Sequence, residues 1–203
     1  FPYTTLFRSC TKSNEGFATA GGVQYVACAG NFKDAGLEYT GALKVLQMIF
    51  SYEYLWIQIR VKGGAYGCMC SFSDQGDSMF VTYRDPNLSE SYKVYDEAAD
   101  YVADFDADDR DMKKYIIGTI GSMDMPMEAV DMGARSFHAY FLGKTEADLQ
   151  KVRDQVLSCT QEDIRALAPI VKAVVEAGNR CCIGNEEKID QNKEYFDEVK
   201  HVL

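Results

Sequence analysis

Arg60 and Tyr66 flank a pair of glycines in the segment Arg60-Val-Lys-Gly-Gly-Ala-Tyr66. A guanidinium carries several N–H donors and a phenol carries one O–H donor. A turn that brings both to one side could therefore grip a peptide carbonyl group. Gly63 and Gly64 would make that turn, because helix ends favour glycine. A structural role fits the same residues, since an arginine at a helix end complements the negative pole of the helix. The residues alone leave both interpretations open.

The histidines do not form a metal-binding pattern. Zinc-dependent hydrolysis needs at least three protein ligands and a general base near the bound water. The chain has two histidines, His138 and His201, and neither stands in an H-x-x-E-H or H-E-x-x-H arrangement. We therefore expect no zinc site of the usual kind in this chain. His138 is interpreted as a packed or surface residue of a helix.

The acidic run from Asp104 to Asp111 superficially resembles a calcium-binding loop. It lacks the glycine and the glutamate that such a loop needs at its sixth and twelfth positions. Carboxylates at the start of a helix complement the helix dipole, so we expect this run to begin a helix.

The seven cysteines do not form a recognisable framework. Cys68 and Cys70 are separated by one residue, and Cys181 and Cys182 are adjacent, whereas zinc knuckles and thioredoxin-type sites have a two-residue gap. We expect small buried hydrophobic residues in a reducing cytosol. A cysteine-dependent redox protein is the alternative, and it would require Cys68 and Cys70.

The composition excludes some classes of partner. The 203-residue chain carries 21 basic and 31 acidic residues, which gives a net charge of −10. Nucleic acids demand a basic face, so we expect no nucleic-acid partner, although the acidity allows attraction to cationic peptides. Charges and glycines interrupt every apolar stretch before the roughly 18 residues that a membrane span needs, so no membrane partner is expected.

The pattern of apolar residues and turn signals predicts an α+β fold: a mixed or antiparallel sheet with helices packed on one face. Helix 40–60 is apolar on most sides and should be largely buried, Trp56 included. Ser89 should cap the helix that follows it. Expected strands lie within 16–30 (one or two), 65–72, 78–84 and 180–184; expected helices lie at about 40–60, from 89 onward, and at 108–122, 126–141, 145–158, 161–176 and 186–202.

Four segments together resemble the presequence-protease branch of the pitrilysin/insulinase metallopeptidases. They are Arg60 to Gly67, Tyr83-Arg-Asp-Pro-Asn87, Val23-Gln-Tyr-Val-Ala27 and Ile183-Gly-Asn-Glu-Glu187. The similarity runs in register from about residue 15 to the end of the chain. The resemblance implies a domain like those of the mitochondrial processing peptidase.

The same resemblance implies an activity and its site residues. Members of this family have four similar domains in two halves that close around a peptide, and the first half carries an H-x-x-E-H zinc motif. The last domain supplies an arginine and a tyrosine, which Arg60 and Tyr66 match in type and spacing. The resemblance thus implies Arg60 and Tyr66 as catalytic and substrate-binding residues, with Gly63 and Gly64 beside the substrate. Zinc would be held by the N-terminal half of the same polypeptide, and an unfolded peptide would be the other partner.

We expect residues 1–9 to be a non-native leader and residues 10–203 to be the fourth, C-terminal domain, truncated at its start. The isolated chain should then be inactive. A bacterial cytoplasm is the expected location, with the mitochondrial matrix as the eukaryotic equivalent. The alternative within the family is a non-catalytic structural or peptide-binding subunit.

Overall fold

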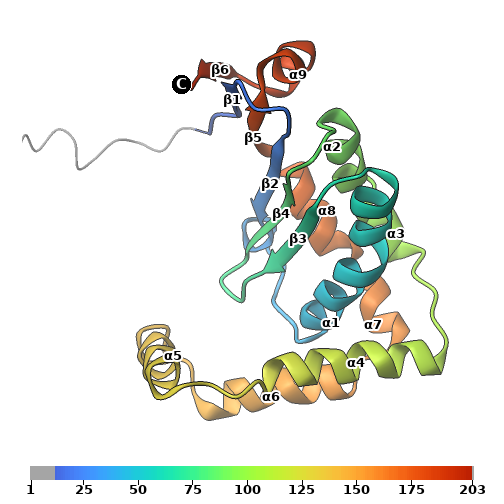
Figure 1. Ribbon diagram of the computed structural model, residues 1–203. Coiled ribbons are helices and arrows are strands. Elements are labelled where there is room, and N and C mark those ends of the chain that lie inside the picture. The colour runs from blue at the N-terminus through green and yellow to red at the C-terminus, as the bar shows by residue number, and fades with distance from the viewer. Residues whose placement is uncertain (1–11, 203) are drawn as a thin grey trace, which may run out of the picture.

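A computed structural model describes residues 12–202, and within them six strands form one mixed sheet (Figure 1). The order across the sheet is β3-β4-β2-β5-β1-β6. Strand β1 runs parallel to β5 and β6, and the remaining neighbours are antiparallel. The strands are β1 Glu15–Thr19, β2 Tyr25–Asn31, β3 Gly67–Phe72, β4 Asp77–Tyr83, β5 Asn179–Asn185 and β6 Glu198–His201.

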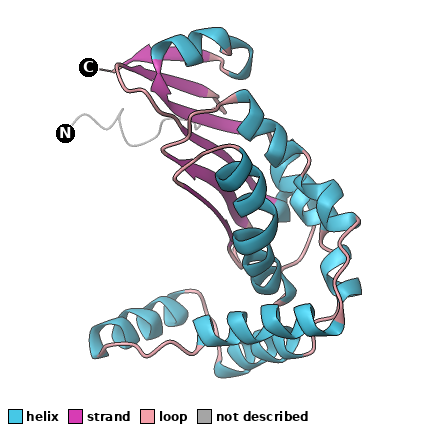
Figure 2. Ribbon diagram, turned by 45° about the vertical axis from the view of Figure 1, so that its right-hand side comes forward, coloured by secondary structure: helices cyan, strands magenta, loops and turns pink. Residues whose placement is uncertain are grey.

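The helices cover one face of this sheet, so the predicted α+β architecture is confirmed (Figure 2). Helices α1, α2 and α8 contact the sheet directly, and α4 and α6 lie side by side beyond them. The α-helices are α1 Ala42–Ile49, α2 Ser89–Asp96, α3 Ala98–Ala103, α4 Asp109–Met123, α5 Ala129–Phe141, α6 Glu146–Leu157, α7 Gln161–Arg165, α8 Ala168–Glu176 and α9 Glu186–Gln191. Short 3₁₀ turns lie at Phe32–Ala35 and Lys193–Tyr195.

The helix predicted over 40–60 continues to Lys62, but its second half has wider turns than an α-helix. Segments η3 (Phe50–Tyr54) and η4 (Trp56–Lys62) are π-helical, with i→i+5 bonds such as Gly63 N–H to the Gln58 carbonyl at 3.0 Å. Tyr52, Trp56 and Arg60 are consequently all exposed at a spacing of four residues. The expectation that Trp56 is buried was wrong, because a 3.6-residue period does not describe these turns.

Two other expected helices were interrupted. The helix predicted over 161–176 divides into α7 and α8, and Pro169 lies in the first turn of α8, where its missing N–H costs no helical bond. The helix expected from residue 89 divides into α2 and α3 at Glu97. Ser89 does not cap α2: the cap position is Leu88, and the Ser89 hydroxyl donates to the Glu90 carboxylate at 3.1 Å.

The closing helix predicted over 186–202 was also wrong. Helix α9 ends at Gln191, where the Asn192 side chain donates to the Lys188 carbonyl oxygen at 2.8 Å. The chain then returns as β6 and pairs in parallel with β1 at the edge of the sheet. This pairing joins segments from the two ends of the chain, so local sequence preference could not reveal it.

Phe50 lies at the centre of the core between the sheet and the helices. Its ring is fully buried and contacts four other aromatic rings with centroid distances between 5.7 and 6.3 Å. Those rings belong to Tyr54, Phe72, Phe80 and Tyr101. This cluster packs the π-helical segment against the β3–β4 hairpin, the two elements that the Gly63–Gly64 turn connects.

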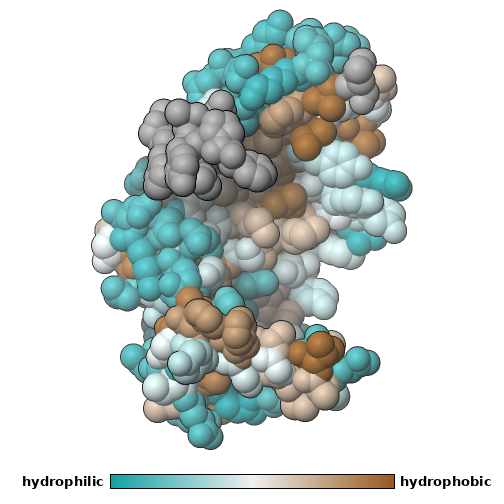
Figure 3. Space-filling view, turned by 90° about the vertical axis from the view of Figure 1, so that its left-hand side faces the viewer, coloured by the Kyte–Doolittle hydropathy of each residue, from teal (hydrophilic) through white to brown (hydrophobic). Residues whose placement is uncertain are grey.

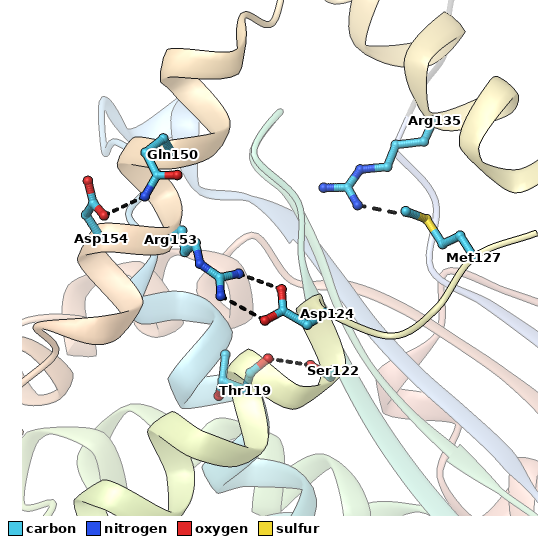
Figure 4. A network of polar contacts seen from close by, with 8 residues as sticks. All are labelled: Thr119, Ser122, Asp124, Met127, Arg135, Gln150, Arg153 and Asp154. Carbon is cyan, nitrogen blue, oxygen red and sulfur yellow. Dashed lines mark hydrogen bonds and ion pairs between the residues drawn. The ribbon is translucent and has the colours of Figure 1, made fainter.

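A two-bond ion pair holds α6 against the end of α4 (Figure 4). The Arg153 guanidinium donates to both carboxylate oxygens of Asp124, at 2.5 and 2.8 Å. Helix α5 projects beyond this pair, and Figure 4 shows Arg135 of α5 pointing towards Met127. None of the residues of α5 is buried.

The other face of the sheet carries exposed apolar side chains. Residues alternate between the two faces of a strand, and the side that the helices leave open carries exposed Tyr25, Met69, Met79, Tyr83 and Ile183. Figure 3 views the molecule from this side and shows a hollowed surface with hydrophobic residues in its middle. We refer to these five residues as the open face. Within residues 12–202, no helix has the length and apolar character to cross a membrane.

Candidate functional site

Arg60 lies on the exposed side of the π-helical segment and packs on an aromatic ring. Its guanidinium carbon lies 4.0 Å from the centroid of the Trp56 ring. Such cation–π stacking holds a guanidinium in place while its N–H groups stay available. Arg60 forms no ion pair with any residue in the part of the chain that the structure describes. The sequence shows the four-residue spacing of Trp56 and Arg60, but the period of an α-helix places Trp56 in the core.

Gly63 and Gly64 form the predicted turn between the helix and β3. Gly64 has a φ of 80°, a conformation that side chains other than glycine rarely adopt. A Cβ on Gly63 would lie 2.5 Å from the carbonyl oxygen of Ile59, so this position also requires glycine. The turn ends at buried Ala65, and Tyr66 follows it directly.

Tyr66 lies at the entrance to β3 with 65% of its surface exposed. Its ring meets the Tyr83 ring edge-on at a centroid distance of 5.8 Å, and Tyr83 meets Tyr25 in the same way at 5.4 Å. Tyr66 therefore begins a row of aromatic rings that leads onto the open face. No motif in the sequence gives Tyr25 a site role, although its alternation with apolar Val26 in a strand is a signal for the open face.

The structure places Arg60 and Tyr66 on the same side of the turn. The guanidinium carbon of Arg60 lies 5.9 Å from the centroid of the Tyr66 ring. A second guanidinium, that of Arg84, lies 5.6 Å from the Tyr83 ring. The site thus combines exposed N–H and O–H donors with apolar rings, which suits a polar backbone that carries apolar side chains.

The described residues do not provide a zinc site. Among residues 12–202, no three histidine, cysteine, aspartate or glutamate side chains lie close enough to hold a metal ion. His138 is exposed on α5, and the Nδ1 atom of His201 lies 3.4 Å from the Glu186 carboxylate. The acidic run begins a helix as predicted, because Asp108 caps α4 by accepting hydrogen bonds from the Arg110 and Asp111 N–H groups.

The six cysteines within residues 12–202 are buried or half-buried. Burial raises the pKa of Cys68 to about 11, and the nearby positive charge of Arg60 opposes this shift. Burial also raises the pKa of Cys28 to about 11 and that of Cys182 to about 12. Since the thiolate is the reactive form, these groups are poorly suited to redox chemistry at neutral pH.

We predict that these thiols resist alkylation in the folded chain. A pKa raised from 9.0 to about 11 lowers the thiolate fraction of Cys68 at pH 7 by about a hundredfold. Iodoacetamide labelling at pH 7, read for each cysteine by mass spectrometry, should be at least tenfold slower in buffer than in urea. The same peptides in urea serve as the control. Rapid native labelling of Cys68 would favour the redox alternative.

Sequence comparison shows which proteins this chain is similar to. A profile of the family described as "PreP C-terminal domain" matches residues 14–185. Protein HypA of Clostridium perfringens is 43% identical over 192 residues, which are 95% of this chain and 20% of HypA. Presequence protease 1, chloroplastic/mitochondrial, of Arabidopsis thaliana is 34% identical over 194 residues, which are 94% of this chain and 18% of that protein. The chain therefore spans about a fifth of the length of these relatives.

Comparison of folds agrees with the sequence comparison. The peptidase M16 inactive domain from Pseudomonas fluorescens superposes with a TM-score of 0.60 at 15% identity, over 85% of this chain and 43% of that chain. At this identity the similarity concerns the fold alone. The family profile covers most of the chain, and the resemblance read from the Arg60–Gly67 and Tyr83–Asn87 segments is confirmed at the level of the family. The chain belongs to the family of the PreP C-terminal domain.

Proposed function

We propose that this chain is the substrate-binding C-terminal domain of a zinc-dependent metalloendopeptidase that degrades short unfolded peptides. The observation that carries the proposal is the exposed pair Arg60 and Tyr66, at the end of the row of rings that leads onto the open face. The guanidinium carbon of Arg60 lies 5.9 Å from the centroid of the Tyr66 ring. Membership of the PreP C-terminal domain family supports the peptidase assignment.

Each member of the pair would have its own part in this function. The Tyr66 hydroxyl would donate a hydrogen bond to the scissile carbonyl oxygen, or to its neighbour, as negative charge develops there. The Arg60 guanidinium would hold the peptide backbone through its N–H groups. Gly63 and Gly64 would let the backbone of the turn approach the substrate closely, since neither carries a side chain.

The surface around the pair favours an extended peptide as the substrate. The open face carries Tyr25, Met69, Met79, Tyr83 and Ile183, which can take apolar side chains of a peptide laid along it. The net charge of −10 would attract cationic peptides over a longer range. A folded protein keeps its backbone hydrogen-bonded internally, so an unfolded peptide fits this site better.

The zinc ion of the proposed enzyme would lie in the N-terminal half of the same polypeptide, because residues 12–202 do not fit it. When bound there, zinc would supply an activated water molecule. This chain would contribute substrate binding and hydrogen-bond donors, and would cut nothing by itself. A bacterial cytoplasm is the proposed location, which the similarity to a Clostridium protein supports. The eukaryotic equivalent would be the mitochondrial matrix.

Reconstitution tests this proposal. We expect neither this chain nor the part of HypA that precedes its matching region to cleave a fluorogenic unfolded peptide alone. A mixture of the two with zinc should cleave it, and a chelator should stop the reaction. A mixture that binds the labelled peptide, shown by fluorescence anisotropy, but never cleaves it would contradict the catalytic assignment.

That contrary result would support the second candidate function, a non-catalytic structural or peptide-binding subunit. Its specific support is the similarity in fold to a peptidase domain described as inactive. The full-length reading frame distinguishes the two candidates. An upstream H-x-x-E-H motif favours the enzyme, and a degenerate motif favours the subunit.

A further inference from the structure

The segment Arg84–Asn87 packs against the Gly63–Gly64 turn and forms hydrogen bonds on both sides of it. The Asn87 side-chain amide donates to the carbonyl oxygen of Gly63 at 2.6 Å. The Tyr66 N–H donates to the carbonyl oxygen of Arg84 at 3.2 Å. A Cβ on Gly64 would lie 3.6 Å from Cγ of Pro86, so the proline ring is in contact range of the turn. One segment therefore contacts the turn at three successive points.

The contact to Gly63 falls where a helix most needs a partner. The last carbonyl groups of a helix receive no hydrogen bond from an N–H group of the same helix, so they require a donor from elsewhere. Asn87 supplies such a donor at the C-cap of η4. The turn is thus held by a side chain rather than by solvent, which limits how far it can move.

Asn87 is itself fixed by a buried carboxyl group. Asp85 is fully buried, and its two oxygens accept from the Asn87 N–H at 2.9 Å and from the Ser91 hydroxyl at 2.6 Å. Burial raises the pKa of Asp85, and these hydrogen bonds oppose the shift. The Asp85 backbone also exchanges two hydrogen bonds with Gln24, at 2.7 and 2.8 Å. Asp85 therefore anchors the segment to the sheet just before β2.

The backbone of this segment shows a further sign of constraint. Arg84 has a φ of 49°, the only positive value for a residue other than glycine within the described chain. Such conformations persist where the surrounding contacts determine them. At this position of the segment, the Arg84 carbonyl oxygen accepts from the Tyr66 N–H, and three residues later the Asn87 side chain donates to Gly63.

We infer that Asn87 is a positioning residue, which holds the Gly63–Gly64 turn and thereby keeps Tyr66 in place for the peptide. This inference rests on the proposed function. It assigns a physical role to the segment Tyr83-Arg-Asp-Pro-Asn87, one of the four segments that carry the family resemblance. Asn87 itself contacts no substrate in this assignment and acts only through the turn.

The first experiment measures the turn in the 203-residue chain and needs no peptidase activity. Asn87→Ala removes the amide, and Asn87→Asp keeps the shape but replaces the N–H donor. We expect amide hydrogen exchange at Gly64 and Tyr66 to become about tenfold faster in both variants. Asn179→Ala is the matched control, because the Asn179 amide also donates to a backbone carbonyl, that of Ala29, at 3.0 Å. Exchange at Tyr66 should be unchanged in this control.

The second experiment measures activity in the reconstituted mixture with zinc. A misplaced donor costs transition-state stabilisation, so Asn87→Asp should lower kcat about tenfold and change KM little. Unchanged exchange at Tyr66 in Asn87→Asp would overturn the inference whatever the activity. Faster exchange with unchanged kcat would also overturn it, provided that Tyr66→Phe does lower kcat. If Tyr66→Phe leaves kcat unchanged, the proposed function fails, and the exchange result alone then decides whether Asn87 holds the turn.

Discussion

Replacement of Tyr66 by phenylalanine should lower kcat of the reconstituted enzyme by about a hundredfold or more, with a much smaller change in KM. The substitution removes one O–H donor and keeps the ring that meets Tyr83 at 5.8 Å. A donor that acts on developing negative charge contributes more in the transition state than in the bound substrate, so turnover suffers more than binding. Initial rates of cleavage over a range of peptide concentrations separate the two constants.

Tyr52→Phe is the matched control for this prediction. Tyr52 is exposed to the same extent as Tyr66, 65%, and lies on the preceding π-helical turn. It lines a hollow together with Glu53 of η3 and Tyr115 of α4, and none of the five residues of the open face lines that hollow. Its loss of a hydroxyl should leave kcat unchanged. Equal activities of the Tyr66→Phe and Tyr52→Phe variants would remove Tyr66 from the mechanism.

Replacement of Phe50 by alanine should lower the free energy of unfolding by about 3–5 kcal/mol. The fully buried ring contacts the four aromatic rings described above, and the hydrophobic residues around it would close only part of the resulting cavity. Urea unfolding followed by circular dichroism measures the change.

Phe137→Ala provides the comparison for the core. Phe137 lies on α5 with 65% of its surface exposed, and its aromatic neighbour Phe141 is on the same helix. Its removal should change the free energy of unfolding by no more than about 0.5 kcal/mol. Equal losses for the two variants would show that the aromatic cluster does not hold the sheet and helices together.

The sequence was sufficient for those elements whose signals are local. The strands expected at 65–72 and 78–84 are β3 and β4, and the Ser73 N–H closes the turn between them on the Asp77 carbonyl oxygen at 2.9 Å. Thr160 caps α7 in a capping box, accepting from the Asp163 N–H at 3.2 Å, close to the start of the helix expected from residue 161. The hairpin turn and the helix cap each depend on residues only three or four positions apart, so their signals are local in the sequence.

The elements that were missed depend on distant contacts or on unusual geometry. Strand β6 forms because Glu198 pairs with Glu15, at the opposite end of the chain. Trp56 is exposed because π-helical turns place it in line with Arg60, whereas the expected 3.6-residue period placed it in the core. The contact between Asn87 and Gly63 joins residues 24 positions apart, and no pattern of residue spacing predicts it.

The candidate site was more accessible to sequence reasoning than these elements. Two glycines between an arginine and a tyrosine predicted a turn at this point, and the structure brings both side chains to one side of that turn. Their chemical roles stay predictions, because hydrogen-bond donors on a surface can serve stability as well as catalysis.

The wide helical turns of Phe50–Lys62 also bear on how this domain can change over evolutionary time. Successive residues of a helix point in different directions around its axis, so the loss or gain of one residue here would rotate Arg60 about the axis and away from Tyr66. Substitutions in this stretch can leave that alignment intact, whereas changes of length cannot. Insertions and deletions should therefore accumulate in α5, which has no buried residue, and be purged between Phe50 and Tyr66.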